Sequence, residues 1–301
     1  MNENTNFPQA TDSTDTTHST HSTEDTAATA SPLILVLGAT GKTGRRVAER
    51  LEAAGANVRR GSRSASPAFD WEDPATWPGA LADVTSVYVS FFPDLAVPGA
   101  PEAIAEFTTQ AEKAGVRRLV LLSGRGEVEA QRAEAVVAAS QLEWTVVRAS
   151  WFAQNFSEGA FAESVLAGEV ALPVGDVGEP FIDAEDIADV AVAALTEDGH
   201  HGQVYEVTGP RLLTFAEAVG TIAEASGHAV SFTSIPLEAF TAFLGEVGEA
   251  PEVIDMLAYL FTEVLDGRNA FVGDGVQRAL GRPPRDFTEY ARTAAENGAW
   301  K

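Results

Sequence analysis

The sequence predicts an α/β fold, a doubly wound parallel sheet followed by a smaller, mostly helical lobe. From Leu33 to about residue 150, short apolar segments typical of buried strands alternate with segments of helical periodicity, as parallel sheets with right-handed crossovers require. Beyond residue 150 the helical period dominates. We therefore expect residues 32–150 to form the core of the sheet domain, and residues 151–301 to complete that core and build the lobe.

The first strand is predicted at Leu33–Leu37, a continuous apolar run typical of a strand covered on both faces. Val47, Leu51 and Ala54 follow at helical spacing, and Gly55 ends that helix. The alternation continues with strands predicted at residues 57–60, 68–70, 86–91, 118–123 and 144–148, and helices at residues 73–81, 102–114 and 127–140.

In the second half, a helix predicted at residues 183–195 begins with the acids Asp183, Glu185 and Asp186. Acids suit the positive end of a helix dipole, so capping is preferred to catalysis for these three. A strand is predicted at residues 203–208, and a helix at 214–226 opens with the capping-box pair Thr214 and Glu217. Helical patterns run through residue 265 and recur at residues 287–291.

The composition excludes several classes of function. The formal net charge is −24, from 44 acidic and 20 basic residues, and no basic stripe stands against it, so nucleic acid is not expected as a partner. The chain has no cysteine, which excludes disulfides, thiolate catalysis and cysteine-ligated zinc. We predict no metal site.

Residues 1–31 are predicted to be a disordered tail, because they are rich in Thr, Ser, Asp and Asn and poor in large apolar side chains. They lack the basic and apolar regions of a secretory signal. No stretch reaches the roughly 18 apolar residues of a membrane span. We therefore expect a cytoplasmic protein without a membrane partner, and its oligomeric state stays open.

The turn GATGKTG, at residues 38–44, carries the first site prediction. Gly38 permits a sharp exit from the strand, Gly41 lets the backbone approach a pyrophosphate, and Gly44 allows close helix packing. Thr40, Lys42 and Thr43 complete the predicted cradle. An ATP-binding P-loop is excluded because it needs a glycine five residues before Gly41, where this chain has Val36.

The second strand indicates which dinucleotide binds. An NAD site usually places an acid there for the ribose hydroxyls, whereas this chain has Ser62 and Arg63, which can hold a 2′-phosphate. NADPH is therefore expected in preference to NADH, although solvated arginines are the alternative. Asp70 and Trp71 are predicted to border the adenine, unless Trp71 simply packs.

The chain from about residue 33 to 301 resembles the NmrA-like branch of the atypical short-chain dehydrogenases/reductases, which includes agroclavine dehydrogenase-type reductases and NADPH quinone reductases. The resemblance implies NAD(P)H binding but names no substrate, because the branch also holds redox sensors and non-catalytic regulators. It rests on GATGKTG at residues 38–44, GSRS at 61–64, RRLVLLSG at 117–124, WTVVRASWFAQNF at 144–156 and FIDAEDIADVAVAAL at 181–195.

One departure from this family bears on mechanism. Short-chain reductases that act on carbonyls typically use a Tyr-x-x-x-Lys pair, whose expected positions hold Gly126 and Ala130 here, and residues 89–204 contain no tyrosine. Ser123 remains, but a serine alone is a poor acid. We therefore assign no catalytic residue, and expect substrates that accept hydride with little help: conjugated imines, iminium cations or quinones.

The substrate pocket is predicted from aromatic side chains near the strand ends. Ser90 and Phe91 are assigned to the cofactor, and Phe92, Trp151, Phe152 and Asn155 to a flat conjugated substrate, with Phe156 as a further candidate. Arg125 and Glu127 flank the turn after a strand and could orient a ligand, but a solvated loop is preferred. The sequence thus predicts an NADPH-dependent reductase; the alternative is a non-catalytic NADP(H) sensor acting through a protein partner.

Overall fold

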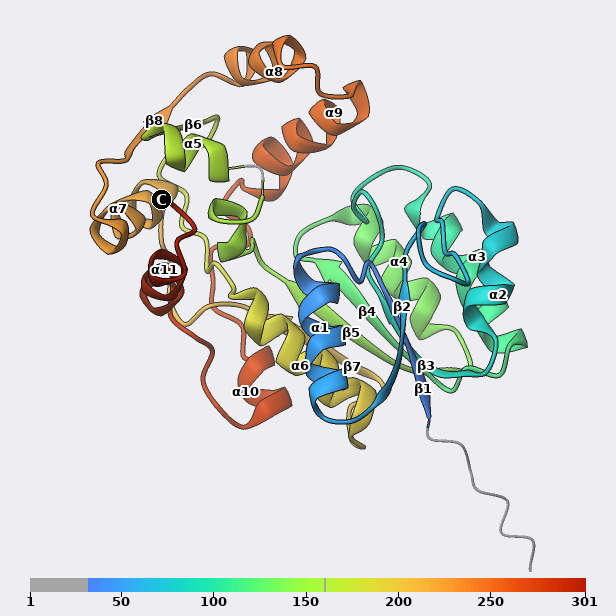
Figure 1. Ribbon diagram of the computed structural model, residues 1–301. Coiled ribbons are helices and arrows are strands. Elements are labelled where there is room, and N and C mark those ends of the chain that lie inside the picture. Colours follow the sequence, from blue (N-terminus) through green and yellow to red (C-terminus); the bar gives the residue numbers. More distant parts are fainter. Residues whose placement is uncertain (1–31, 160) are drawn as a thin grey trace, which may run out of the picture. The chain divides into compact units, whose positions relative to one another are not determined.

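The computed structural model describes residues 32–159 and 161–301 (Figure 1). The tail predicted at residues 1–31 lies outside the described residues. A six-stranded sheet in the order β2-β1-β3-β4-β5-β7 is parallel at every pairing, which confirms the predicted doubly wound sheet. Its strands are β1 Leu33–Leu37, β2 Asn57–Gly61, β3 Val84–Val89, β4 Arg118–Gly124, β5 Glu143–Ala149 and β7 Gln203–Val207.

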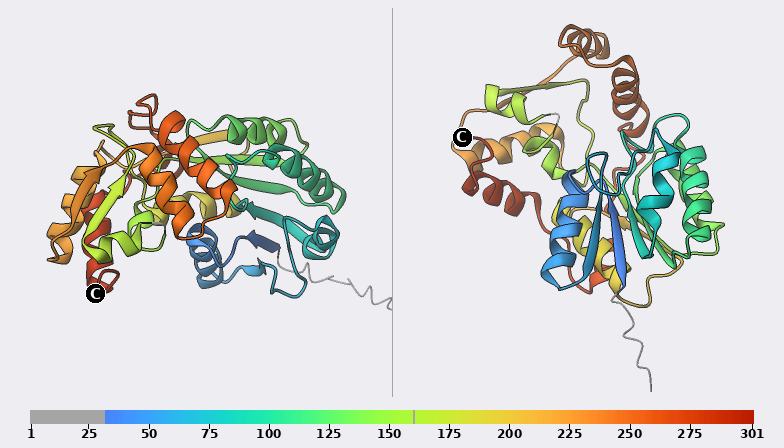
Figure 2. Two further views of the ribbon diagram at one scale, coloured as in Figure 1. Left: turned by 90° about the horizontal axis from the view of Figure 1, so that it is seen from above. Right: turned by 45° about the vertical axis from the view of Figure 1, so that its right-hand side comes forward.

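Helices cover both faces of this sheet (Figure 2). Alternate residues of β1 supply the two cores: Leu35 and Leu37 pack on one side, Ile34 and Val36 on the other, which is why the strand reads as an unbroken apolar run. The first face carries α2 Trp77–Leu81, α3 Ala100–Lys113 and α4 Val128–Ala138, and the second carries α1 Lys42–Ala53, α6 Ala184–Thr196 and α10 Gly275–Leu280.

The strand predicted at residues 68–70 is wrong. The backbone N–H of Asp70 donates to Thr76 Oγ1 at 3.0 Å, and its carbonyl accepts from Trp77 Nε1 at 2.6 Å. These groups therefore bond to the following 3-10 turn, η1 Pro74–Thr76, and to α2, and β2 remains an edge of the sheet.

The remaining elements form a lobe around a third core of largely aromatic and aliphatic side chains. Its two parallel strands were not predicted, because four residues are too few to show a period. The predicted caps are confirmed: Asp183 accepts from the N–H of Glu185, and Thr214 forms a capping box with Glu217. The lobe contains β6 Glu169–Leu172, β8 Ser231–Ser234, η2 Ala153–Phe156, α5 Ala162–Ala167, α7 Phe215–Ser226, α8 Leu237–Glu246, α9 Pro251–Tyr259, a π turn at Leu260–Val264 and α11 Phe287–Glu296.

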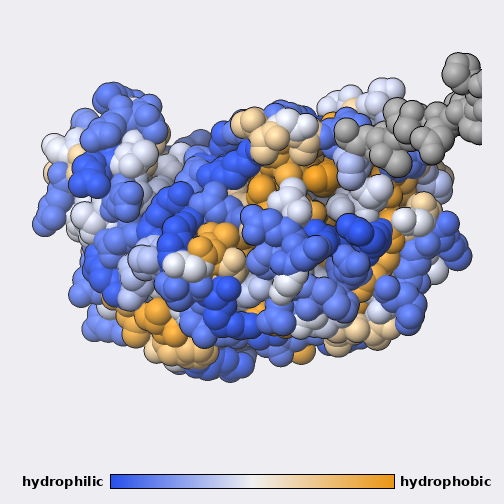
Figure 3. Space-filling view, turned by 90° about the horizontal axis from the view of Figure 1, so that it is seen from below, coloured by the Kyte–Doolittle hydropathy of each residue, from blue (hydrophilic) through white to orange (hydrophobic). Residues whose placement is uncertain are grey.

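Hydrophilic residues dominate the face shown in Figure 3, consistent with the large excess of acids. Across the described residues, no helix combines the length and apolar character needed to cross a membrane.

Candidate cofactor and substrate site

The glycine turn lies at the point where the sheet reverses its strand order. The chain runs from β1 to β2 on one side and then returns to β3 on the other, and such switch points open a crevice at the carboxyl ends of the strands. Gly38 follows β1 with φ +65°, and a Cβ there would lie 3.2 Å from the Cβ of Ser90. Glycine therefore satisfies both the left-handed backbone and the close approach of the two strand ends.

The N-terminus of α1 is suited to binding an anion. The N–H of Gly41 donates to Gly38 O at 2.8 Å, and a Cβ on Gly44 would collide with that same carbonyl oxygen. Gly41 caps the helix without any side-chain hydrogen bond, and the first turn contains no acid. The orphan N–H groups and the helix dipole are therefore available to a phosphate, so the turn fits the pyrophosphate of a dinucleotide.

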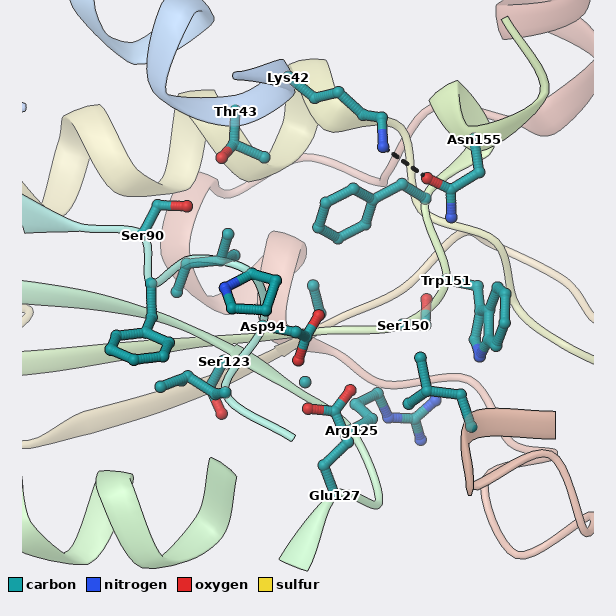
Figure 4. Close-up of a pocket in the computed structure, with 18 of the residues that line it drawn as sticks. Lys42, Thr43, Ser90, Asp94, Ser123, Arg125, Glu127, Ser150, Trp151 and Asn155 are labelled. Carbon is teal, nitrogen blue, oxygen red and sulfur yellow. Dashed lines mark hydrogen bonds between the residues drawn. The ribbon is translucent and has the colours of Figure 1, made fainter. Parts of the chain in front are cut away.

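A cavity of about 560 Å³ extends from this turn along the ends of β3, β4 and β5 (Figure 4). Its size falls in the range of small-molecule sites. Of the residues that the sequence assigned to cofactor or substrate, twelve line it: Gly38, Thr40, Gly41, Lys42, Thr43, Ser90, Phe91, Phe92, Ser123, Trp151, Phe152 and Asn155.

The other assigned residues lie outside the cavity lining. Gly44 lies beneath the turn, and Ser62 and Arg63 follow β2, where Ser62 Oγ is 3.3 Å from Ser64 Oγ. Asp70 receives the N–H of Glu72 at 3.1 Å. Trp71 packs on Phe69, Phe91 and Phe107 and donates to Ser90 O at 3.3 Å. Phe156 is fully buried in the core of the lobe.

Lys42 connects the glycine turn to the lobe. Its Nζ donates to Asn155 Oδ1 at 3.0 Å (Figure 4). Burial lowers the pKa of Lys42, opposed by the nearby charge of Glu158. A phosphate beside the ammonium would favour its charged form, so this lysine suits a bound dinucleotide.

Ser123 is held by a network beneath the cavity floor. Its hydroxyl donates to Glu134 Oε1 at 2.6 Å, and Glu134 pairs with Arg148, which also donates to Glu206 at 2.9 Å. The hydroxyl proton of Ser123 is therefore engaged with Glu134, although its side chain borders the cavity.

The preference for Arg125 and Glu127 as solvated loop residues is wrong. They are 4% and 9% exposed, and both line the cavity. Arg125 donates to the carbonyls of Asn269 and Phe271 at 3.2 and 3.3 Å, while the Glu127 carboxyl folds against Gly124, where a Cβ would collide with it. The flanking glycines were the available signal, because Gly124 makes room for the Glu127 carboxyl and Gly126 for the side chain of Asn269.

Two further carboxyls at the cavity were not found from the sequence. Asp94, in the loop after β3, is oriented toward Glu127 (Figure 4). Glu179 is 2% exposed and accepts the N–H of Trp151 at 3.1 Å; burial raises its pKa to about 7. No spacing in the sequence links these positions, which three separate loops bring together.

The positions expected for a Tyr-x-x-x-Lys pair offer no acid. Gly126 has φ +77°, and a Cβ there would collide with the Asn269 side chain, while Ala130 is fully buried in the core. Among the described residues that line the cavity there is no tyrosine, histidine or cysteine, and Lys42 is its single lysine.

The fold and the site thus define an α/β protein that binds a dinucleotide at a switch-point crevice, with an aromatic and acidic pocket beside it. Residues 38–198 match the family model described as NAD(P)H-binding. The chain belongs to this family, in the NmrA-like branch of the atypical short-chain dehydrogenases/reductases, and is an NAD(P)H-dependent oxidoreductase.

Three known proteins illustrate the relationship. An NAD(P)H azoreductase from Xenophilus azovorans is 33% identical over 238 residues, which cover 76% of this chain and 82% of the relative. The triphenylmethane reductase of Citrobacter sp., solved with NADP(H), superposes with a TM-score of 0.70 at 19% identity, covering 87% of this chain and 99% of that one. An NADPH-dependent quinone oxidoreductase from Escherichia coli, solved with NADPH, gives 0.69 at 23% identity, covering 86% and 99%.

Proposed function

We propose that this protein is an NADPH-dependent reductase that transfers hydride to a flat, conjugated electrophile with a C=N, N=N or quinone group. The observation that carries the proposal is the continuity of the cavity, which joins the glycine turn to an aromatic wall of Phe91, Trp151 and Phe152. A planar conjugated substrate gains from such rings, and a cationic one gains further from their faces. The bound cofactor would supply the hydride.

The chain's own residues would bind and orient the reactants. The N–H groups at the start of α1 and the ammonium of Lys42 would hold phosphate, and the aromatic side chains would keep water from the reacting atoms. The relatives support the proposed class of substrate, because the three described above are an azoreductase, a triphenylmethane reductase and a quinone oxidoreductase.

The preference for NADPH is supported by the residues that end β2. Arg59 donates to the carbonyls of Ala80 and Ala82, and Arg60 pairs with Glu52. Arg63 is exposed, and within residues 32–159 and 161–301 no carboxylate forms an ion pair with it. It is therefore the arginine at this strand end that is available for a 2′-phosphate, with Ser62 as a hydroxyl donor.

The test is NADPH oxidation by the purified full chain with menadione, an azo dye and a cyclic iminium salt. Turnover of at least one electrophile, with NADPH preferred to NADH, is expected. Trp151→Leu should raise KM for these electrophiles while leaving NADPH affinity unchanged. No turnover across the panel would contradict the proposal, and tighter binding of NADP⁺ than of NADPH without turnover would favour the redox sensor.

A further inference from the structure

The pairing of the buried carboxyl of Glu127 with the half-buried carboxyl of Asp94 at the cavity is not explained by cofactor binding. Asp94 comes from the loop between β3 and α3, and Glu127 from the turn between β4 and α4; their carboxyl groups meet inside the pocket (Figure 4). Two ionised carboxylates have no hydrogen to share, and Glu127 Oε2 is buried without a donor among the described residues. One proton held between the two groups satisfies both oxygens.

The surroundings favour Glu127 as the group that holds this proton. Burial, then the negative charge and hydrogen bond of Asp94, then the charge of Glu134, raise the pKa of Glu127 well above its ordinary value. Burial also raises the pKa of Asp94, but the N–H of Ala96 at 2.9 Å and the charge of Lys42 favour its ionised form. These surroundings therefore favour a protonated Glu127 beside an ionised Asp94.

Other titratable groups near the pair do not replace it. Glu179 lines the same cavity, but the N–H of Trp151, at 3.1 Å, and the charge of Arg125 favour its ionised form. Arg125 also lines the cavity, but it donates to the carbonyls of Asn269 and Phe271 and lies 3.7 Å from Glu206. Tyr259 accepts the N–H of Val128 at 3.2 Å and does not belong to the cavity lining. The hydroxyl proton of Ser123 is engaged with Glu134.

We propose that Glu127, paired with Asp94, is the general acid of this reductase and replaces the tyrosine that its carbonyl-reducing relatives use. The inference rests on the proposed function. Hydride adds to one end of the substrate's N=N or conjugated C=O system and its π electron pair moves to the other end, which takes the proton from the Glu127 carboxyl as the O–H bond breaks. Asp94 is only partly buried, so it connects the resulting carboxylate with solvent for reprotonation.

The substrates divide into two groups on this basis. Reduction of an azo or quinone group consumes one hydride and one proton, so it needs the acid. An iminium cation needs hydride alone, because its electron pair returns to a nitrogen that loses its positive charge. Loss of the acid must therefore separate the two classes, which a purely structural role of Glu127 does not do.

The test compares wild type, Glu127→Gln and the control Glu106→Gln, an exposed acid of α3. The amide introduced at Glu127 can donate to Asp94 and keep their contact, but it cannot deliver a proton. Menadione and azo reduction by Glu127→Gln should fall about 100- to 10,000-fold, while cyclic iminium reduction stays within about threefold. The control should match wild type on both.

Two measurements support the comparison. In wild type, kcat/KM for menadione should fall as pH rises through the raised pKa of Glu127, whereas the iminium profile should lack that step. Asp94→Asn removes the charge that raises this pKa, so its menadione profile should fall at lower pH. Infrared difference spectra of the cofactor-free protein should show a protonated carboxyl at neutral pH that Glu127→Gln lacks.

The outcomes separate the two proposals. If wild type reduces neither class, the proposed function fails. If wild type reduces both while Glu127→Gln loses both equally, or loses neither, or if the carboxyl band is absent, the reductase stands and the acid is not Glu127.

Discussion

Glu179 offers a quantitative test of the buried carboxyls at the site. Burial raises its pKa from the ordinary 4.5 to about 7, partly offset by the N–H of Trp151 and the charge of Arg125. At 1.36 kcal/mol for each tenfold change in acid strength, this difference corresponds to about 3 kcal/mol. Because the folded chain binds the proton more tightly than the unfolded chain, the stability is present below pH 4.5 and is lost as pH rises through about 7.

Glu179→Gln removes this pH dependence without removing the acceptor for Trp151. The variant should therefore gain stability over wild type as pH increases, and the gain at pH 8 should exceed the gain at pH 5 by up to about 3 kcal/mol. Urea denaturation at both values measures it, and the difference between the two gains cancels every other titrating group. A gain that is equal at both values, or larger at pH 5, would refute the reasoning.

Three further predictions address cofactor binding and the N-terminal residues. Arg63→Ser should reduce the preference for NADPH over NADH by about tenfold to a hundredfold, as expected for a lost charge-assisted hydrogen bond. The control Arg60→Ser, which breaks a surface ion pair with Glu52, should leave this preference unchanged. Fluorescence titration measures both variants, and an unaltered preference in Arg63→Ser would mean that the 2′-phosphate is held elsewhere. Lys42→Met should weaken NADPH and NADH alike, by about tenfold or more, in the same titration; a selective loss of one cofactor would contradict its assignment to the pyrophosphate. Deleting residues 2–30 should leave the melting temperature and NADPH affinity intact, and a clear loss of either would show that these residues contribute to the folded protein.

The elements that could be predicted are those whose sequence carries its own local signal. The apolar run Leu33–Leu37 predicts a strand covered on both faces, and both faces of β1 are covered. The glycine after it predicts a sharp turn, and Gly38 takes a left-handed backbone. The caps at Asp183 and Thr214 are equally local. The prediction of a strand at residues 68–70 was wrong because Asp70 forms hydrogen bonds to η1 and α2, and these cannot be inferred from the composition of the segment.

The acidic half of the site could not be predicted because tertiary structure creates it. Asp94, Glu127 and Glu179 are separated by 33 and 52 residues in the chain and belong to three different connections. In the sequence each is an ordinary acid in a loop, and only the tertiary structure shields it from solvent. The aromatic half was easier to predict, because Trp151 and Phe152 follow within three residues of the end of β5, whose carboxyl end belongs to the crevice.

Hydride transfer from NADPH to a conjugated substrate is the central claim, and an isotope label tests it most directly. The full chain would be supplied with NADPH deuterated at C4 on either face, together with a cyclic iminium salt, and the product analysed by mass spectrometry and NMR. One of the two labelled cofactors should place deuterium on the former iminium carbon and slow single turnover. NADPH consumption that leaves both products free of deuterium would contradict the claim.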